Sequence, residues 1–196
     1  MQVERIIYPV TTLGPGNRIG IWTIGCTKRC KNCISPELRR PRPDKNISVS
    51  TLICFVRDII ENNTADGITI SGGDPLEQPE DLLAFITGIS GICSDILIYT
   101  GYTLPELEDL WSDIRMVTLR NHTAVLIDGR YIHEQNDGMS ALTGSTNQQI
   151  HYFNSTLRPL YEEYLRSHGR EVQNYYFKTN LVSVGIHPKE DQSGSI

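Results

Sequence analysis

Three of the five cysteines in this 196-residue chain lie within eight residues of one another, at Cys26, Cys30 and Cys33. Thiolates are soft ligands that bind zinc, copper(I) or iron–sulfur clusters. A structural zinc site takes four protein ligands, and this compact group supplies three. A [4Fe–4S] cluster usually takes four cysteines, so three would leave one iron with an open coordination position. We expect Cys54 and Cys93 to be buried apolar residues rather than ligands.

A second group of residues with chemical potential is Gly72-Gly73-Asp74-Pro75, which follows a short apolar run. Paired glycines let a backbone approach a ligand closely because they carry no side chain. Asp74 offers a carboxylate to an ammonium group. The segment is not a phosphate-binding P-loop, because no Gly-Lys-Ser/Thr sequence follows it. Taken alone, these four residues would also suit an ordinary turn before a helix.

The apolar pattern predicts alternating strands and helices that would position these loops. The expected strands cover residues 18–23, 68–70, 95–99, 124–127, 171–177 and 181–186. The expected helices cover 50–62, a segment from Pro79, a segment opened by a capping box at 103–106, and a segment near 157–165. Residues 115–122 are ambiguous between helix and strand. Such alternation implies parallel strands, with functional residues gathered at their carboxyl ends.

The overall composition is that of a globular protein, with 39% hydrophobic and 21% charged residues. Lys plus Arg total 18 and Asp plus Glu total 23, giving a net charge of −5 that does not favour binding to nucleic acid. No segment approaches the ~18 apolar residues of a membrane span. The first residues lack the basic flank and apolar core of a signal peptide. We therefore expect no nucleic-acid partner, no membrane partner and a cytoplasmic location.

The order of these motifs resembles that of the radical S-adenosylmethionine (radical SAM) superfamily. A C-x3-C-x2-C sequence after a first strand is the signature of that superfamily, and residues 72–75 resemble its motif for gripping the methionine amino group. The closer resemblance is to the activating enzymes of glycyl-radical enzymes, especially the anaerobic ribonucleotide reductase activase group. The matching segments are 22–26, 70–76, 99–102, 125–129 and 142–148. One departure is Asn32, where many relatives carry an aromatic residue.

The resemblance implies a single-domain α/β fold, a partial (β/α)6-type radical SAM barrel with parallel strands. The core would span 1–188 with a cluster loop at 24–46, and 189–196 would form a polar tail. The implied metal ligands are Cys26, Cys30 and Cys33. The implied cofactor-binding residues are Gly72, Gly73, Asp74, Pro75, Asn32, Tyr99, Asp128, Ser145 and Asn147. No catalytic side chain is implied beyond the cluster and the cofactor.

The activity implied by the resemblance is reductive cleavage of S-adenosylmethionine at a [4Fe–4S] cluster, giving a 5′-deoxyadenosyl radical. This radical would generate a glycyl radical on a partner such as anaerobic ribonucleotide reductase, with an electron from a flavodoxin or a ferredoxin. One alternative is a radical SAM enzyme that modifies a peptide or a small molecule. A second alternative is a non-catalytic module in which the three cysteines hold a structural metal.

Overall fold

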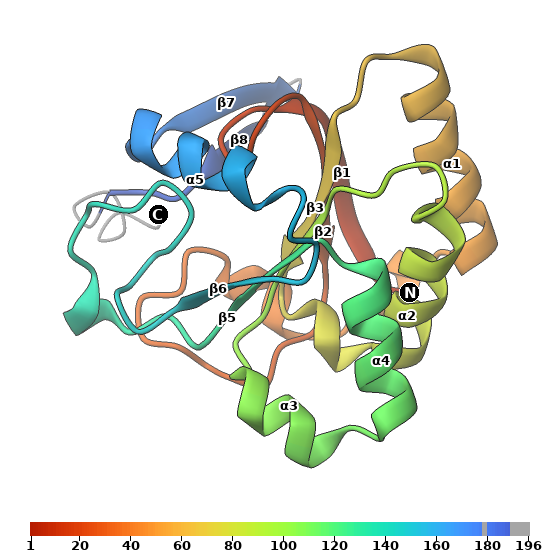
Figure 1. Ribbon diagram of the computed structural model, residues 1–196, viewed down its shortest axis with the longest axis horizontal. Coiled ribbons are helices and arrows are strands. Elements are labelled where there is room, and N and C mark those ends of the chain that lie inside the picture. Colours follow the sequence, from red (N-terminus) through yellow and green to blue (C-terminus); the bar gives the residue numbers. More distant parts are fainter. Residues whose placement is uncertain (178–179, 189–196) are drawn as a thin grey trace.

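The computed structural model describes residues 1–177 and 180–188, and Figure 1 shows a layered arrangement of helices around a central sheet. Within these ranges, six strands form one sheet in the order β1-β2-β3-β4-β5-β6, and β7 and β8 form a separate ribbon. The strands are β1 Val3–Val10, β2 Arg18–Thr23, β3 Gly67–Gly72, β4 Ile96–Tyr99, β5 Val125–Asp128, β6 Gln149–Tyr152, β7 Val172–Phe177 and β8 Asn180–Gly185. The helices are α1 Val49–Asn62, α2 Pro79–Ile89, α3 Leu104–Leu110, α4 Asp113–His122 and α5 Arg158–Ser167.

The sheet is mostly parallel but not entirely so. Strands β2 to β5 pair in parallel, while β1 and β6 pair antiparallel at the two edges. The connection from β1 to β2 is short, and a parallel pairing would need a crossover of about a dozen residues or more. The prediction of parallel strands therefore holds for the four central strands, and the two antiparallel edge strands were not predicted.

The sheet stays open in the part of the chain that the structure describes, and no closed barrel is formed there. The two final strands were expected to extend the parallel arrangement. Instead β7 and β8 pair only with each other, antiparallel. The observed fold is a mixed α/β architecture with a mostly parallel central sheet.

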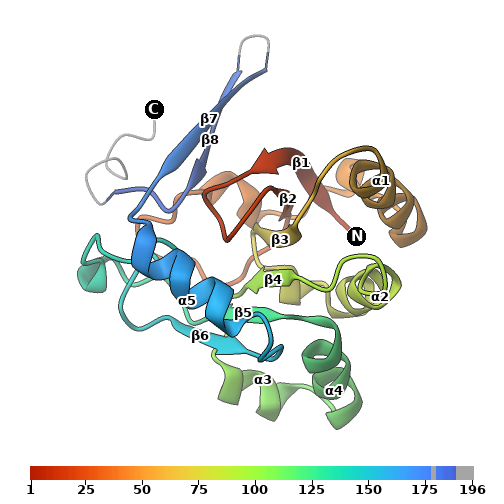
Figure 2. The same cartoon turned by 45° about the horizontal axis from the view of Figure 1, so that its top comes forward.

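Helices cover both faces of the sheet, as Figure 2 shows: α1, α2 and α4 lie on one side and α5 on the other. Side chains of successive strand residues point to opposite faces. In β4, Ile96 and Ile98 accordingly join the core beneath α1, α2 and α4. Leu97 joins a second core that contains Tyr161 of α5. Both faces of the central strands are thus buried, which explains their continuous apolar sequences.

Local signals account for the helix boundaries. The Ser48 side chain caps α1 by accepting a hydrogen bond from the Thr51 N–H at 3.0 Å. The expected capping box opens α3, with Thr103 and Glu106 bonded reciprocally. The ambiguous segment 115–122 is helical and belongs to α4.

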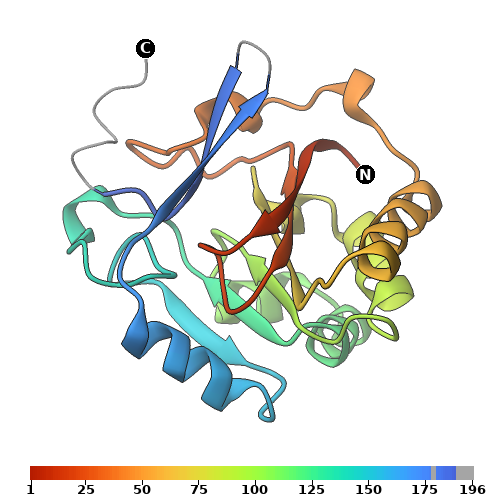
Figure 3. The ribbon, with the colours of Figure 1, turned by 90° about the horizontal axis from the view of Figure 1, so that it is seen from above.

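The β7–β8 ribbon is attached to the domain at its base. Val184 packs there with Ile7, Val10 and Leu13 in a third buried cluster. Figure 2 and Figure 3 show the ribbon projecting beyond the sheet on the side of β1. The polar tail expected at 189–196 lies outside the described residues. None of the helices described is both long and apolar enough to cross a membrane.

Candidate functional site

One pocket at the carboxyl ends of the parallel strands contains several of the residues that the sequence singled out. Its lining includes Cys26, Cys30 and Cys33 from the loop after β2, and residues 71–74 at the end of β3. Residues 99–101 lie at the end of β4 and just after it, Gly129 follows β5, and these also line the pocket. Four loops that are distant in sequence therefore meet at one site, as expected for parallel strands.

Backbone hydrogen bonds hold the cysteine loop at both ends. The Gly25 N–H donates to the Leu38 carbonyl at 2.8 Å, and the Cys26 N–H donates to the Arg39 carbonyl at 3.0 Å. The Arg39 guanidinium donates in turn to the Cys30 carbonyl at 2.7 Å. Inside the loop, Arg29 and Asn32 have left-handed backbone conformations, with φ of 50° and 55°. These two reversals bend the loop tightly, so that its three thiols line one side of the pocket.

The three thiols are half-buried, and their surroundings affect their ionisation. Burial raises the pKa of the Cys26 thiol, and Lys28 opposes that effect. Burial also raises the pKa of the Cys30 thiol, and the cations Arg130 and Arg39 oppose it. The thiolate is the form that binds metal, and these cations favour it.

The donor set fits an iron–sulfur cluster. Within 1–177 and 180–188, no three His, Cys, Asp or Glu side chains converge closely enough to hold one metal ion. In a cluster each thiolate binds a different iron, so three sulfurs need only face one pocket. Cys54 and Cys93 do not line this pocket, which leaves three thiols for four irons. Cys93 is buried as expected, whereas Cys54 is exposed on α1, so the expectation of burial was wrong for Cys54.

Gly72 and Gly73 are required by the close approach of two backbones. A Cβ atom on Gly72 would lie 2.3 Å from the Thr23 nitrogen, and one on Gly73 would lie 2.4 Å from the Gly25 carbonyl oxygen. The Gly73 N–H donates to the Thr23 carbonyl at 2.8 Å, and the Asp74 N–H donates to the Gly25 carbonyl at 2.7 Å. The glycines therefore join the end of β3 to the start of the cysteine loop, in addition to lining the pocket.

Asp74 is almost fully buried, with 1% of its surface exposed. Its carboxylate accepts hydrogen bonds from the Leu76 N–H at 3.1 Å, the Thr100 hydroxyl at 2.9 Å and the Gly101 N–H at 3.0 Å. Burial raises the pKa of Asp74, while these bonds and the nearby Lys28 ammonium act in the opposite direction. Asp74 thus ties the loop after β3 to the loop after β4, and its contact with a cofactor ammonium stays a prediction.

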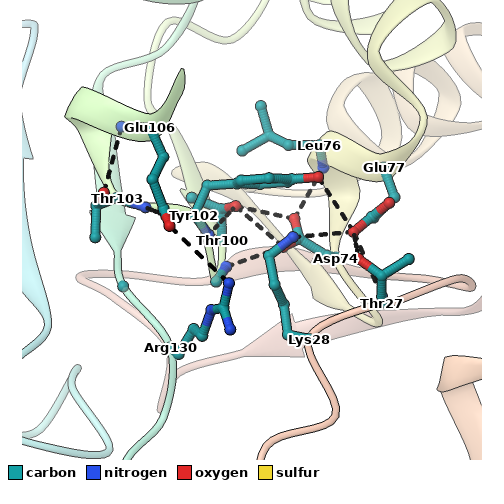
Figure 4. A network of polar contacts seen from close by, with 12 residues as sticks. Thr27, Lys28, Asp74, Leu76, Glu77, Thr100, Tyr102, Thr103, Glu106 and Arg130 are labelled. Atoms are coloured by element: carbon teal, nitrogen blue, oxygen red, sulfur yellow. Dashed lines mark hydrogen bonds and ion pairs between the residues drawn. The ribbon is translucent and has the colours of Figure 1, made fainter. Parts of the chain in front are cut away.

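A network that sequence analysis did not select lies beside Asp74 (Figure 4). The Lys28 ammonium lies 3.0 Å from the Glu77 carboxylate and 3.0 Å from the centroid of the Tyr102 ring. The Tyr102 hydroxyl donates to Glu77 at 3.3 Å, and the Thr27 hydroxyl donates to the same oxygen. Burial by itself lowers the pKa of Lys28, but the contacts with Glu77 and Tyr102 outweigh it and the net pKa is raised.

Asn32 and Tyr99, which were predicted to bind the cofactor, also line the pocket, and their contact with a cofactor stays a prediction. The Tyr99 hydroxyl is buried and has no hydrogen-bond partner in the part of the chain that the structure describes. Burial raises the pKa of Tyr99 far above its usual range, so this phenol stays neutral. Pro75 is buried at the start of a short 3-10 turn, Pro75–Glu77, and is not among the described residues of the lining.

The residues at the end of β5 connect the pocket to neighbouring elements. Gly129 lines the pocket, and its neighbour Asp128 is not among the described lining residues. The buried Asp128 carboxylate accepts hydrogen bonds from the Leu104 N–H at 2.6 Å and the Gln149 N–H at 3.3 Å, and lies 2.9 Å from the His151 imidazole. Asp128 therefore fixes the starts of α3 and β6, and its contact with a cofactor stays a prediction.

In residues 144–148, too, some side chains bond to neighbouring loops and another lines the pocket. Ser145 accepts a hydrogen bond from the Ile132 N–H at 3.1 Å and Asn147 donates to the Arg130 carbonyl at 2.8 Å, and neither is among the described lining residues. Gln148 does line the pocket. Its side chain accepts from the Gly144 N–H at 2.7 Å and donates to the Gly129 carbonyl at 3.0 Å. Gln148 is a lining residue that sequence reasoning missed, although it belongs to the quoted motif.

Comparison with known proteins agrees with this geometry. A family model described as a 4Fe-4S single cluster domain matches residues 12–151, a range that contains all three pocket cysteines and Asp74. The chain belongs to this family. Its cofactor is therefore a [4Fe–4S] cluster, and the three half-buried thiols are the donor set that fits it.

The curated relatives of the chain carry one functional name. The anaerobic ribonucleoside-triphosphate reductase-activating protein of Haemophilus influenzae is 35% identical over 161 residues, covering 74% of this chain and 95% of that protein. The protein of the same name from Escherichia coli K12 is 30% identical over 151 residues, with the same coverage. That of enterobacteria phage T4 is 27% identical over 156 residues, covering 76% of this chain and 93% of the phage protein.

The segment beyond residue 151 lies outside the match to the 4Fe-4S family model but still contributes to the site. Gly185, Ile186 and His187, at the end of β8 and after it, line the pocket. Arg170 holds this region in place by donating to the Gly144 carbonyl at 3.2 Å and to the His187 carbonyl at 3.2 Å. The C-terminal segment thus closes one side of a pocket built mainly by the family domain.

Proposed function

We propose that this chain generates a glycyl radical on an anaerobic ribonucleotide reductase. A [4Fe–4S] cluster bound by Cys26, Cys30 and Cys33 and S-adenosylmethionine bound beside it would share the pocket described above. The observation that carries the proposal is that the three thiols and residues 72–74 line one pocket. The relatives named as activating proteins of that reductase support the choice of partner.

When bound, the cluster would supply one electron for cleavage of S-adenosylmethionine to methionine and a 5′-deoxyadenosyl radical, and this radical would take a hydrogen atom from a glycine of the partner. The residues of the chain itself would bind and orient the cluster and S-adenosylmethionine. Cys26, Cys30 and Cys33 would hold three of the four irons, which would leave the fourth open to the cofactor. Gly72 and Gly73 keep side chains out of their part of the pocket, so that backbone groups would face the cofactor there.

Other lining residues shape the remainder of the pocket. Tyr99 and Asn32 provide surface for the adenosine part of the cofactor, and Ile34 and Ile186 contribute apolar side chains that exclude water. Hydrogen-atom transfer needs no general acid or base. We therefore assign no such role to a histidine or a carboxylate of the chain.

We further propose a flavodoxin or a ferredoxin as electron donor, because the reaction consumes single electrons. We place the reaction in the cytoplasm. The five cysteines are free thiols, and free thiols are typical of a reducing compartment.

The test is anaerobic reconstitution with iron and sulfide, followed by mixing with reductant, S-adenosylmethionine and the reductase. We expect a glycine-centred doublet in electron paramagnetic resonance and 5′-deoxyadenosine as a product. Cys30→Ala should lose the cluster and both signals. Cys54→Ala is the matched control, because Cys54 is a free thiol on the surface of α1, and this variant should keep them.

Two outcomes would replace the proposal. If the reductase acquires no radical while a free peptide or metabolite exchanges deuterium with labelled 5′-deoxyadenosine, the chain modifies that molecule instead. If the purified protein holds a colourless metal and cleaves no S-adenosylmethionine, the cysteines form a structural site.

A further inference from the structure

Lys28 occupies an unusual position for a lysine in a surface loop. It lies between two proposed cluster ligands, Cys26 and Cys30, yet its side chain is only 5% exposed. Lys31, a cation of the same loop, is 70% exposed and pairs with the exposed Glu134. Lysine is almost never buried unless it is paired, because removing an ammonium from water is unfavourable. The burial of Lys28 therefore requires specific compensation.

The compensation comes from two other loops of the pocket. Glu77, in the turn after Asp74, lies 3.0 Å from the ammonium, and the Asp74 carboxylate lies 3.8 Å from it. The ring of Tyr102, from the loop after β4, lies 3.0 Å from the same nitrogen, as a cation–π contact. In Figure 4 the Lys28 side chain extends from the cysteine loop toward Asp74, Glu77 and Tyr102. One side chain thus joins three of the four loops that form the pocket.

We propose that Lys28 is a positioning residue that holds the cysteine loop in the conformation that binds the cluster. A free loop would lose conformational entropy when three of its thiols are fixed by iron, and that loss weakens binding. Attachment of Lys28 to Glu77 and Tyr102 fixes the segment between Cys26 and Cys30 before iron is bound. This inference rests on the proposed function, in which Cys26 and Cys30 are ligands of the cluster.

The charge of Lys28 has a second consequence. The ammonium balances one of the two neighbouring carboxylates, Asp74 and Glu77, and the reduction potential of an iron–sulfur cluster depends on the charge around it. Removal of the ammonium leaves the site more negative, which disfavours the added electron and lowers the potential. Removal of the Glu77 charge has the opposite effect. If Lys28 acted only as a structural support, removal of its charge and removal of the Glu77 charge would not shift the reduction potential of the cluster in opposite directions.

The test compares reconstituted Lys28→Met, Lys28→Arg and Glu77→Gln with wild type, and Lys31→Met serves as the matched control. Iron release to a chelator is followed by absorbance, and the cluster potential by redox titration with electron paramagnetic resonance detection. We expect Lys28→Met to release iron roughly 10- to 100-fold faster, as is typical when a group that supports metal ligands is lost. Lys28→Arg should recover much of the retention, because a guanidinium also pairs with a carboxylate and stacks on an aromatic ring.

The potential should fall in Lys28→Met, rise in Glu77→Gln and stay unchanged in Lys31→Met. Equal iron release from Lys28→Met and Lys31→Met, with equal potentials, would overturn the inference. If Lys28→Met does not fold, Glu77→Gln decides the question. A raised cluster potential and faster iron release than in Lys31→Met would support the inference, and values equal to those of Lys31→Met would overturn it. If wild type itself binds no cluster, the proposed function fails, and this result is distinct from a difference between variants.

Discussion

Two buried cations near opposite ends of β2 have the same kinds of partner but different settings. Arg18, the first residue of β2, forms a two-point ion pair with Asp95 at 2.8 and 3.1 Å, and the Tyr161 hydroxyl donates to the same carboxylate at 2.6 Å. Lys28, in the loop after β2, has Glu77 and Tyr102 as its carboxylate and tyrosine. Each site therefore combines a cation, a carboxylate and a tyrosine.

The two sites differ in which elements they join. Arg18 is fully buried, and its remaining donors reach the Thr69 hydroxyl at 2.7 Å and the Ile68 carbonyl at 2.9 Å, both in β3. Tyr161 brings α5 to the same point. Lys28 joins loops that line the pocket. The same interactions thus support the sheet at one end and position a functional loop at the other, and mutations should separate these roles.

The largest effect on stability is expected from Arg18→Met. This variant leaves the Asp95 carboxylate buried without its cation, and loss of one partner of a buried ion pair destabilises a protein by about 3–5 kcal/mol. Denaturant unfolding of the cluster-free protein measures the change. Arg158→Ala, which removes an exposed pair with Glu162 in α5, is the control and should change stability by less than about 0.5 kcal/mol. A loss below about 1 kcal/mol in Arg18→Met would show that the Arg18 site is not a main support of the sheet.

A smaller loss is expected from Tyr161→Phe, which removes only the hydroxyl that donates to Asp95. A hydrogen bond to a charged group contributes about 1.5–3 kcal/mol, and this bond is buried. Unfolding should be easier by that amount, while cluster content after reconstitution stays at the wild-type level. A reduced iron content at unchanged stability would contradict the separation of the two regions.

Gly73→Ala tests the contact between β3 and the cysteine loop. The added methyl group would lie 2.4 Å from the Gly25 carbonyl oxygen, so the two backbones must move apart. We expect a loss of about 1–3 kcal/mol and a lower iron content, because the loop no longer fits against β3. Gly91→Ala is the matched control, since a methyl group there meets no atom within 4 Å. Equal iron content in the two variants would remove Gly73 from the support of the cluster loop.

The smallest effect on stability is expected from Tyr102→Phe. The hydroxyl lost here donates to the partly exposed Glu77 at 3.3 Å, and the ring remains beneath Lys28. The loss of unfolding free energy should stay below about 1 kcal/mol. Tyr102→Phe and Tyr161→Phe each remove one tyrosine hydroxyl, so the two variants measure the same chemical change at the two sites. An equal loss of unfolding free energy in the two variants would show that the difference in burial between the sites is unimportant.

Periodicity identified the central elements because their patterns are local. Strands β2 to β5 are short apolar runs, and α1 repeats buried residues such as Leu52 and Val56 at helical spacing. The edge strands were not predicted. β1 contains Arg5 and Pro9, and β6 is the polar sequence Gln-Ile-His-Tyr. Such segments become strands only because a neighbouring strand offers hydrogen bonds to them, and sequence patterns do not contain that pairing.

For the site, the sequence by itself determined that three thiols lie on one short loop, because the spacing of Cys26, Cys30 and Cys33 places them there whatever the rest of the chain does. Tertiary structure decided which other side chains reach that loop. Lys28 and Glu77 are 49 residues apart in the chain, and only the parallel order of β2, β3 and β4 makes them neighbours. Loop conformation likewise directs Gln148 to the pocket and gives Asn147 a bond to Arg130. Local spacing therefore specified the chemistry, while contacts between distant residues specified its geometry.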